Sequence, residues 1–100
     1  MLNRFDAINN LLILFLSLAY DIDSITHKDK RKEYKSKWKE MSKEDLIKEC
    51  RIFFDENYAL SCFRLGEAYT QALYESKNDG EALMYGNSID EVCGYFGIRT

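Results

Sequence analysis

Apolar residues recur every three or four positions along most of this chain, and no stretch alternates apolar and polar residues long enough to require a β-strand. A spacing of three or four places side chains on one face of an α-helix, whereas a half-buried strand needs a period of two. The chain has no proline and only five glycines, so it also lacks the frequent turn residues of an all-β protein. The sequence therefore predicts an all-α fold, a compact single-domain bundle (residues 1–100) of about five helices with short loops.

Capping residues and apolar spacing locate the first helices. We expect one from about residue 3 to 20 with Asn3 as its N-cap, and a second, mostly charged one from about 25 to 41. Ser42, followed by two acids, caps a third helix that is interrupted at about residues 55–57. The apolar faces of these helices and of the next one predict the following core: Leu12, Phe15, Leu16, Leu46, Cys50, Phe53, Leu65 and Tyr69.

The second half of the chain is predicted to hold further helices. One runs from Tyr58 to about residue 76 and is followed by a turn at residues 78–80. A short helix over residues 81–85 ends at Gly86, and Ser88 then opens a last helix that Gly97 stops. The segment 65–69 resembles the opening of a tetratricopeptide-type helix, but no second repeat accompanies it. We therefore interpret Gly66 as a position where a neighbouring helix comes close.

The run Leu11–Leu16 is apolar on nearly every face of its helix. It has the length of a signal-peptide core, yet the preceding flank is weakly charged and the run is too short to span a bilayer. We favour a buried helix in a cytoplasmic protein with free thiols. Uniform apolarity also favours a homodimer, with part of Leu11–Leu16 packed across the interface.

Catalytic and cofactor chemistry find no support in the residue pattern. The three cysteines (Cys50, Cys62 and Cys93) form no Cys-x-x-Cys pair, and His27 is the only histidine. A zinc site or a Cys–His nucleophile is therefore not expected. The isolated glycines form no phosphate-binding loop. We expect neither enzyme activity, nor a metal site, nor a cofactor.

Charge is distributed unevenly along the chain. Residues 27–43 hold eight Lys or Arg residues against three acids, a net charge of +5, whereas residues 44–100 carry −6. Five lysines share one face of the second helix and its exit, with Trp38 nearby on another face: Lys28, Lys32, Lys35, Lys39 and Lys43. A solvated helix face, a docking surface for an acidic protein and a phosphate-binding stripe are the alternatives for this face.

A small binding protein is the function that these features favour. The size, the charge separation and fourteen aromatic residues, more than a small core needs, suit a module that occupies a surface of another macromolecule. Its most concrete form is a stoichiometric inhibitor, such as an immunity protein against a toxin domain or a phage-type inhibitor of a host defence or nuclease complex. We expect its partner-binding residues to include the lysines above, Trp38, and the acids Glu75, Asp79 and Glu81. The alternative is a nucleic-acid-binding accessory protein that uses the lysine face.

Overall fold

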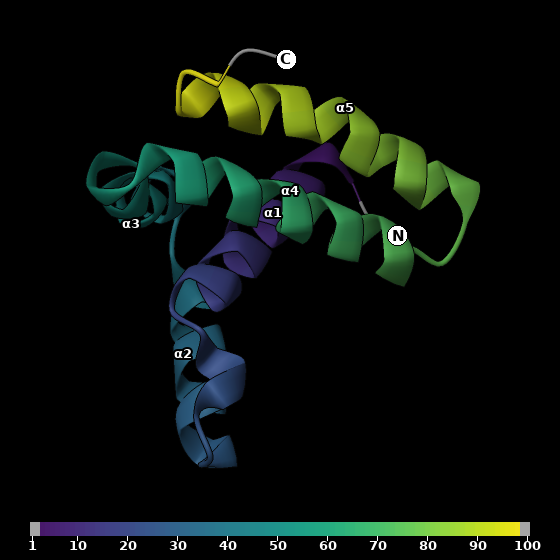
Figure 1. Cartoon of the computed structure of the whole chain (residues 1–100). Coiled ribbons are helices and arrows are strands. Elements are labelled where there is room, and N and C mark those ends of the chain that lie inside the picture. Colours follow the sequence, from purple (N-terminus) through teal and green to yellow (C-terminus); the bar gives the residue numbers. More distant parts are fainter. Residues whose placement is uncertain (1–2, 99–100) are drawn as a thin grey trace.

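The computed structural model describes residues 3–98, apart from the side chain of Arg4. Within residues 3–98 it contains five α-helices, one 3₁₀ helix and no strand, which confirms the predicted all-α bundle (Figure 1). The elements are as follows: α1 Arg4–Ala19, the 3₁₀ helix η1 Ile22–Ser24, α2 Lys28–Glu40, α3 Lys43–Glu56, α4 Tyr58–Glu75 and α5 Asp79–Tyr95.

Helix α1 is the centre of the bundle. The Asn3 side chain caps it as predicted, because its Oδ1 accepts a hydrogen bond from the Asp6 amide at 2.8 Å. The helix contacts α2, α3, α4 and α5, and its Leu11, Leu12, Phe15 and Leu16 side chains are buried. Only Ile13 and Leu14 of the apolar run stay partly exposed. Burial within the chain thus accounts for most of this run, so its apolarity no longer argues for a homodimer through Leu11–Leu16.

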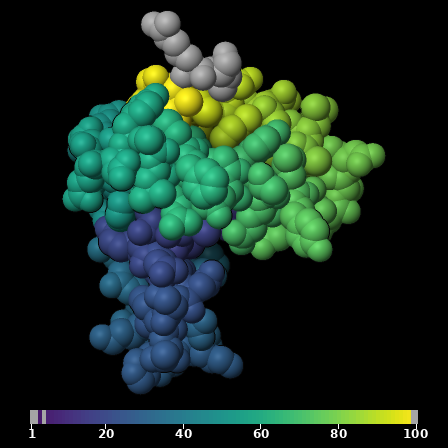
Figure 2. Space-filling view, in the orientation of Figure 1, coloured from purple at the N-terminus to yellow at the C-terminus, as the bar shows by residue number. Residues whose placement is uncertain are grey.

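Helix α2 is an arm that projects from the rest of the bundle (Figures 1 and 2). It packs mainly against α1, and it begins after a sharp reversal in which Asp21 adopts a left-handed backbone conformation (φ 51°). One aromatic cluster anchors the arm: the ring of Tyr20 lies 6.0 Å from that of Tyr34, 5.7 Å from Trp38 and 4.8 Å from Phe53. Tyr34 and Trp38, the aromatic residues of α2, therefore face the bundle, and the lysines and acids of the helix lie in solvent.

Helices α3 and α4 meet at a single capping residue, Asn57. Its Oδ1 accepts a hydrogen bond from the Leu60 amide, while its own amide donates to the carbonyl of Phe53. The Ser42 cap of α3 is confirmed, with its Oγ accepting from the Asp45 amide at 3.2 Å. The core prediction is wrong for Phe53 and Tyr69, which are only partly buried. Phe54 takes the core position instead.

Helix α5 is continuous, so the predicted division at Gly86 and Ser88 is wrong. The N-cap is Asn78, whose Oδ1 accepts from the Glu81 amide at 2.9 Å, and the expected turn at residues 78–80 is already the first turn of the helix. Ser88 lies fully buried in mid-helix, where its hydroxyl donates to the Met84 carbonyl at 2.7 Å. The predicted stop at Gly97 is confirmed by its positive φ of 70°.

Within residues 3–98, no helix is both long enough and apolar enough to cross a membrane.

Candidate partner-binding surfaces

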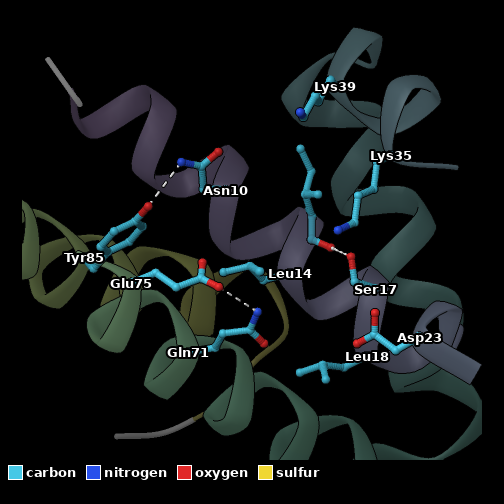
Figure 3. Close-up of a pocket in the computed structure, with 11 residues that line it drawn as sticks. Asn10, Leu14, Ser17, Leu18, Asp23, Lys35, Lys39, Gln71, Glu75 and Tyr85 are labelled. Atoms are coloured by element: carbon cyan, nitrogen blue, oxygen red, sulfur yellow. Dashed lines mark hydrogen bonds between the residues drawn. The ribbon is translucent and has the colours of Figure 1, made fainter. Parts of the chain in front are cut away.

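A groove lies over α1 between the arm and the α4–α5 side of the bundle (Figure 3). Its volume is about 340 Å³. The floor comes from one face of α1, where the apolar spacing that buries Leu12 and Leu16 leaves their neighbours Ile13, Leu14, Ser17 and Leu18 half-exposed. The groove therefore has an apolar floor beneath charged and polar walls.

The two walls differ in charge, and Asp23 of η1 adds a further carboxylate to the lining. Lys35 and Lys39 extend from α2 on one side, while Gln71 and Glu75 extend from α4 on the other (Figure 3). Glu75 accepts a hydrogen bond from the Gln71 amide at 3.2 Å. Neither lysine forms an ion pair with any residue that the structure describes. Both ammonium groups are thus available to an incoming acidic group.

A second hollow continues the groove toward the start of α1. It shares Asn10, Ile13 and Lys39 with the first, and it adds the charged side chains of Asp6, Lys77 and Glu81. Asn10 donates to the hydroxyl of Tyr85 at 3.1 Å, which joins α1 to α5 at the boundary between the hollows. The Asn9 Oδ1 atom, also at this hollow, is buried and accepts no hydrogen bond from the described residues. The sequence-predicted residues Lys35, Lys39, Glu75 and Glu81 all line this continuous surface.

A smaller hollow of about 250 Å³ lies at the free end of the arm. It is lined by four bases at helical spacing, together with Asp23: Lys28, Arg31, Lys32 and Lys35. Because Lys35 also lines the groove, the basic face of α2 runs from its free end into the groove wall.

Three predicted binding residues do not join these surfaces. Trp38 is an expected partner-binding residue, but its side chain is only 1% exposed and so offers a partner almost no surface. Lys43 does not extend the α2 stripe: it opens α3, is half-buried, and places its Nζ 5.8 Å from the centre of the Tyr95 ring. Asp79 is exposed at the first turn of α5 but lines neither hollow of the groove.

The outer face of α4 was not among the predicted sites. Phe63 is 63% exposed and Tyr74 is 91% exposed, so the surplus of aromatic residues does place some of them at the surface, as expected. Between them lies Gly66, and a Cβ atom built there meets no atom within 4 Å. The interpretation of Gly66 as a close approach within the chain is therefore wrong. Helical spacing of Leu60, Phe63 and Tyr74 was the signal available in the sequence, but it does not tell an outer face from an inner one.

Two of the thiols that the structure describes, those of Cys50 and Cys93, have raised pKa values. Burial raises the pKa of the Cys50 thiol well above its ordinary value, and burial together with nearby Asp90 raises that of Cys93. A raised pKa disfavours the thiolate, which is the nucleophilic form. No group of three or more His, Cys, Asp or Glu residues within 3–98 is arranged to hold a metal ion.

Comparisons with protein-family models, with curated proteins and with solved structures found no match to this chain.

Proposed function

We propose that this chain is a protein-binding module that acts by occupying a surface of another macromolecule, rather than an enzyme. The groove over α1 is the observation that supports this most strongly. Its apolar floor and its charged rim of both signs match the anatomy of protein interfaces, in which an apolar centre is surrounded by polar residues. Unpaired Lys35 and Lys39 suit a partner segment that carries acidic side chains beside apolar ones.

In its most concrete form the module is a stoichiometric inhibitor of a toxin or nuclease. The net charge of −6 over residues 44–100 would face the basic nucleic-acid site of such a target. Acids at the groove, Glu75 and Glu81, lie on the side that these residues form. The basic arm and the acidic body would then contact regions of opposite charge on the same partner.

A photoreactive residue at position 39 tests this proposal inside the cell of origin. We expect it to crosslink a specific protein, and the purified protein to lose its activity at one-to-one stoichiometry. Charge reversal by Lys35→Glu should weaken that complex, whereas Lys48→Glu, an exposed lysine on α3, should not. Equal crosslinking from probes at positions 39 and 48, or a complex insensitive to Lys35→Glu, would refute the groove as the binding surface.

Nucleic-acid binding is the second candidate, and the cluster of Lys28, Arg31, Lys32 and Lys35 at one hollow favours it. With four phosphate contacts, a plot of the logarithm of affinity against the logarithm of salt concentration should have a slope of about −4 on duplex DNA. A mobility shift with this slope, lost in a Lys28→Glu/Lys32→Glu variant, would support the second candidate. If the protein causes no mobility shift at moderate salt, nucleic-acid binding is excluded as the function and the protein-binding module is favoured.

A further inference from the structure

The outer face of α4 exposes large apolar side chains that no other part of residues 3–98 covers. Leu60 is 47% exposed, and with Phe63, Glu67, Thr70 and Tyr74 it falls within about 80° of arc on the helix. The helix crosses the front of the bundle in Figure 1, and no other element covers this face in Figure 2. We refer to these five residues as the α4 face.

A broad concavity is centred on this face. Its volume is about 590 Å³, and Phe63 and Tyr74 stand at its two ends. Gly66, Glu67, Thr70 and Gln71 line the space between them. Phe63 and Tyr74 thus project from the helix, and Gly66 leaves a recess between them.

Gly66 lowers the stability of α4, and no contact within the described chain compensates for it. Glycine in a helix interior is about 1 kcal/mol less favourable than alanine, and here the missing Cβ gives no neighbour of its own chain closer access. Gly66 lies about 100° from Glu67 around the helix, so the recess that it leaves is at the edge of the α4 face, where a helix that packs from outside can lie against it.

We propose that the occupant is a second copy of this chain, which packs its own α4 face antiparallel against the first across a two-fold axis near Glu67. The positions are suited to this, since residues 60, 63, 67, 71 and 74 are spaced symmetrically about residue 67. An isologous contact brings Leu60 opposite Tyr74 of the second copy, and Phe63 opposite its Gln71, between its Glu67 and its Tyr74. Each projecting ring then fills the other copy's concavity.

Charge at the centre of the face is compatible with this arrangement. Arg64 Nη1 lies 2.9 Å from Glu67 Oε1, so the acid nearest the axis is already neutralised within its own chain. In the pair, the two Glu67 carboxylates come close to each other at the axis, and each is held by the Arg64 of its own chain. No unpaired charge is therefore buried, which an interface centre seldom tolerates.

The available area indicates a reversible dimer. A Phe or Tyr side chain presents about 150–250 Å², so the exposed parts of Leu60, Phe63 and Tyr74 supply about 400 Å² per copy. With the flanking polar residues, the buried total reaches about 1,000 Å², at the lower edge of specific interfaces. An interface of that size predicts an equilibrium between monomer and dimer in the micromolar range or weaker.

The arrangement also sets where the arms lie. The two-fold axis of a face-to-face, antiparallel α4 pair is perpendicular to α4 and lies in the plane of the interface. Helix α2 leaves the bundle in about the direction of this axis (Figure 1). Both arms of the dimer would therefore point to one side, which places two basic α2 faces and two grooves on the same surface.

Sedimentation equilibrium from low-micromolar to near-millimolar protein tests the proposal. We expect the apparent mass to rise from 11.8 kDa toward twice that value. Phe63→Glu should stay monomeric at every concentration. The matched control is Leu83→Glu, because Leu83 is an equally exposed apolar residue (66%) on α5, and it should dimerise like the parent chain. Gly66→Ala should weaken the dimer at least about tenfold while leaving the monomer folded.

Crosslinking tests the antiparallel geometry. In a Cys62→Ser background, Glu67→Cys should link to itself through a short bismaleimide, whereas Lys48→Cys on α3 should not. A monomer at near-millimolar concentration overturns the proposal. A dimer that persists in Phe63→Glu overturns it as well. So does a dimer that Phe63→Glu and Leu83→Glu disrupt to the same extent. Phe63-dependent binding of a strictly monomeric chain to lipid vesicles would assign the face to a membrane surface instead. None of these outcomes bears on the groove, so the proposed function is tested separately.

Discussion

The ring of Phe54 stacks on the ring of Phe96, with centroids 4.3 Å apart and planes 8° from parallel. On its other side Phe54 stacks on Phe15, at 5.2 Å and 15°. These three rings join α3 to the middle of α1 and to the residue that caps the end of α5. Phe54 therefore connects three helices that are far apart in the sequence.

The adjacent phenylalanines of α3 should differ in their contribution to stability. We expect Phe54→Ala to lower the free energy of unfolding by about 3–5 kcal/mol, because it removes a buried ring between two others. Phe53→Ala should cost about half as much, since Phe53 is only partly buried and meets Phe15 and Tyr20 edge-on. Urea denaturation of the two variants measures the difference. Equal costs, or a larger cost for Phe53→Ala, would contradict the register of α3.

The sequence predicts the helices well because their signals are local. Apolar spacing and the side chains of Asn3 and Ser42 located helix starts that the structure confirms. The choice between Phe53 and Phe54 is not local: the two positions are 100° apart on α3, and which one faces the core depends on where α1 lies. Trp38 is similar, because its burial follows from the ring of Tyr20 on another element.

The start of α5 can be tested by comparing two capping candidates. Asn78→Ala should lower the free energy of unfolding by about 1 kcal/mol, because it leaves the Glu81 amide without its cap. Ser88→Ala should be nearly neutral, since alanine fits a buried mid-helix position and favours the helix. Asn78→Asp serves as the control because it keeps a capping oxygen. If Ser88→Ala proved the costlier change, α5 would be two helices, as the sequence pattern suggests.

The groove was only partly predictable, for a related reason. The sequence predicts Lys35, Lys39, Glu75 and Glu81 as binding residues from their charge, and the structure brings them to one surface. Their convergence depends on the direction in which α2 leaves α1, which is set by the left-handed Asp21 and the Tyr20 cluster. Left-handed aspartate is uncommon enough that sequence patterns do not place it. The apolar floor was missed because it belongs to a helix expected to be wholly buried.

Alkaline pH should loosen the anchor of the arm. The Tyr20 hydroxyl donates to Glu49 Oε1 at 2.5 Å, and burial together with this carboxylate raises the pKa of Tyr20 to about 12. The folded chain thus holds the phenolic proton more tightly than the unfolded chain, whose tyrosine has a pKa of about 10. The resulting stabilisation is complete below pH 10 and is lost as pH rises from about 10 to 12.

Phenolate absorbance during a pH titration measures this effect. The Tyr20 phenol should ionise near pH 12, and its contribution at that pH should disappear in Tyr20→Phe. Unfolding of the Tyr20→Phe variant should also depend less on pH above 10. Tyr74 is the control because it is 91% exposed and far from the cluster, so Tyr74→Phe should keep this contribution. Absorbance near pH 12 that is unchanged in Tyr20→Phe would assign the raised pKa to another tyrosine.

The end of α5 depends on a glycine for its backbone conformation. The Ile98 amide donates to the Cys93 carbonyl at 3.0 Å and the Gly97 amide to that of Gly94 at 3.4 Å, the pairing of a Schellman motif with Gly97 in the left-handed position. Gly97→Ala should lower the free energy of unfolding by about 1–2 kcal/mol, because a Cβ is strained at positive φ. Gly97→Asn should cost less, since asparagine tolerates this conformation.

Gly66→Ala is the matched comparison for Gly97→Ala, because it makes the same chemical change in mid-helix. Its Cβ would meet no atom within 4 Å, so under conditions where the chain is monomeric the free energy of unfolding should rise by up to about 1 kcal/mol. Thermal unfolding at low-micromolar concentration measures both variants. The two changes in the free energy of unfolding should have opposite signs. Backbone strain lowers it in Gly97→Ala, whereas the higher helix propensity of alanine raises it in Gly66→Ala. A loss of stability for Gly66→Ala in the monomer would mean that α4 packs more tightly against its own chain than the structure has it.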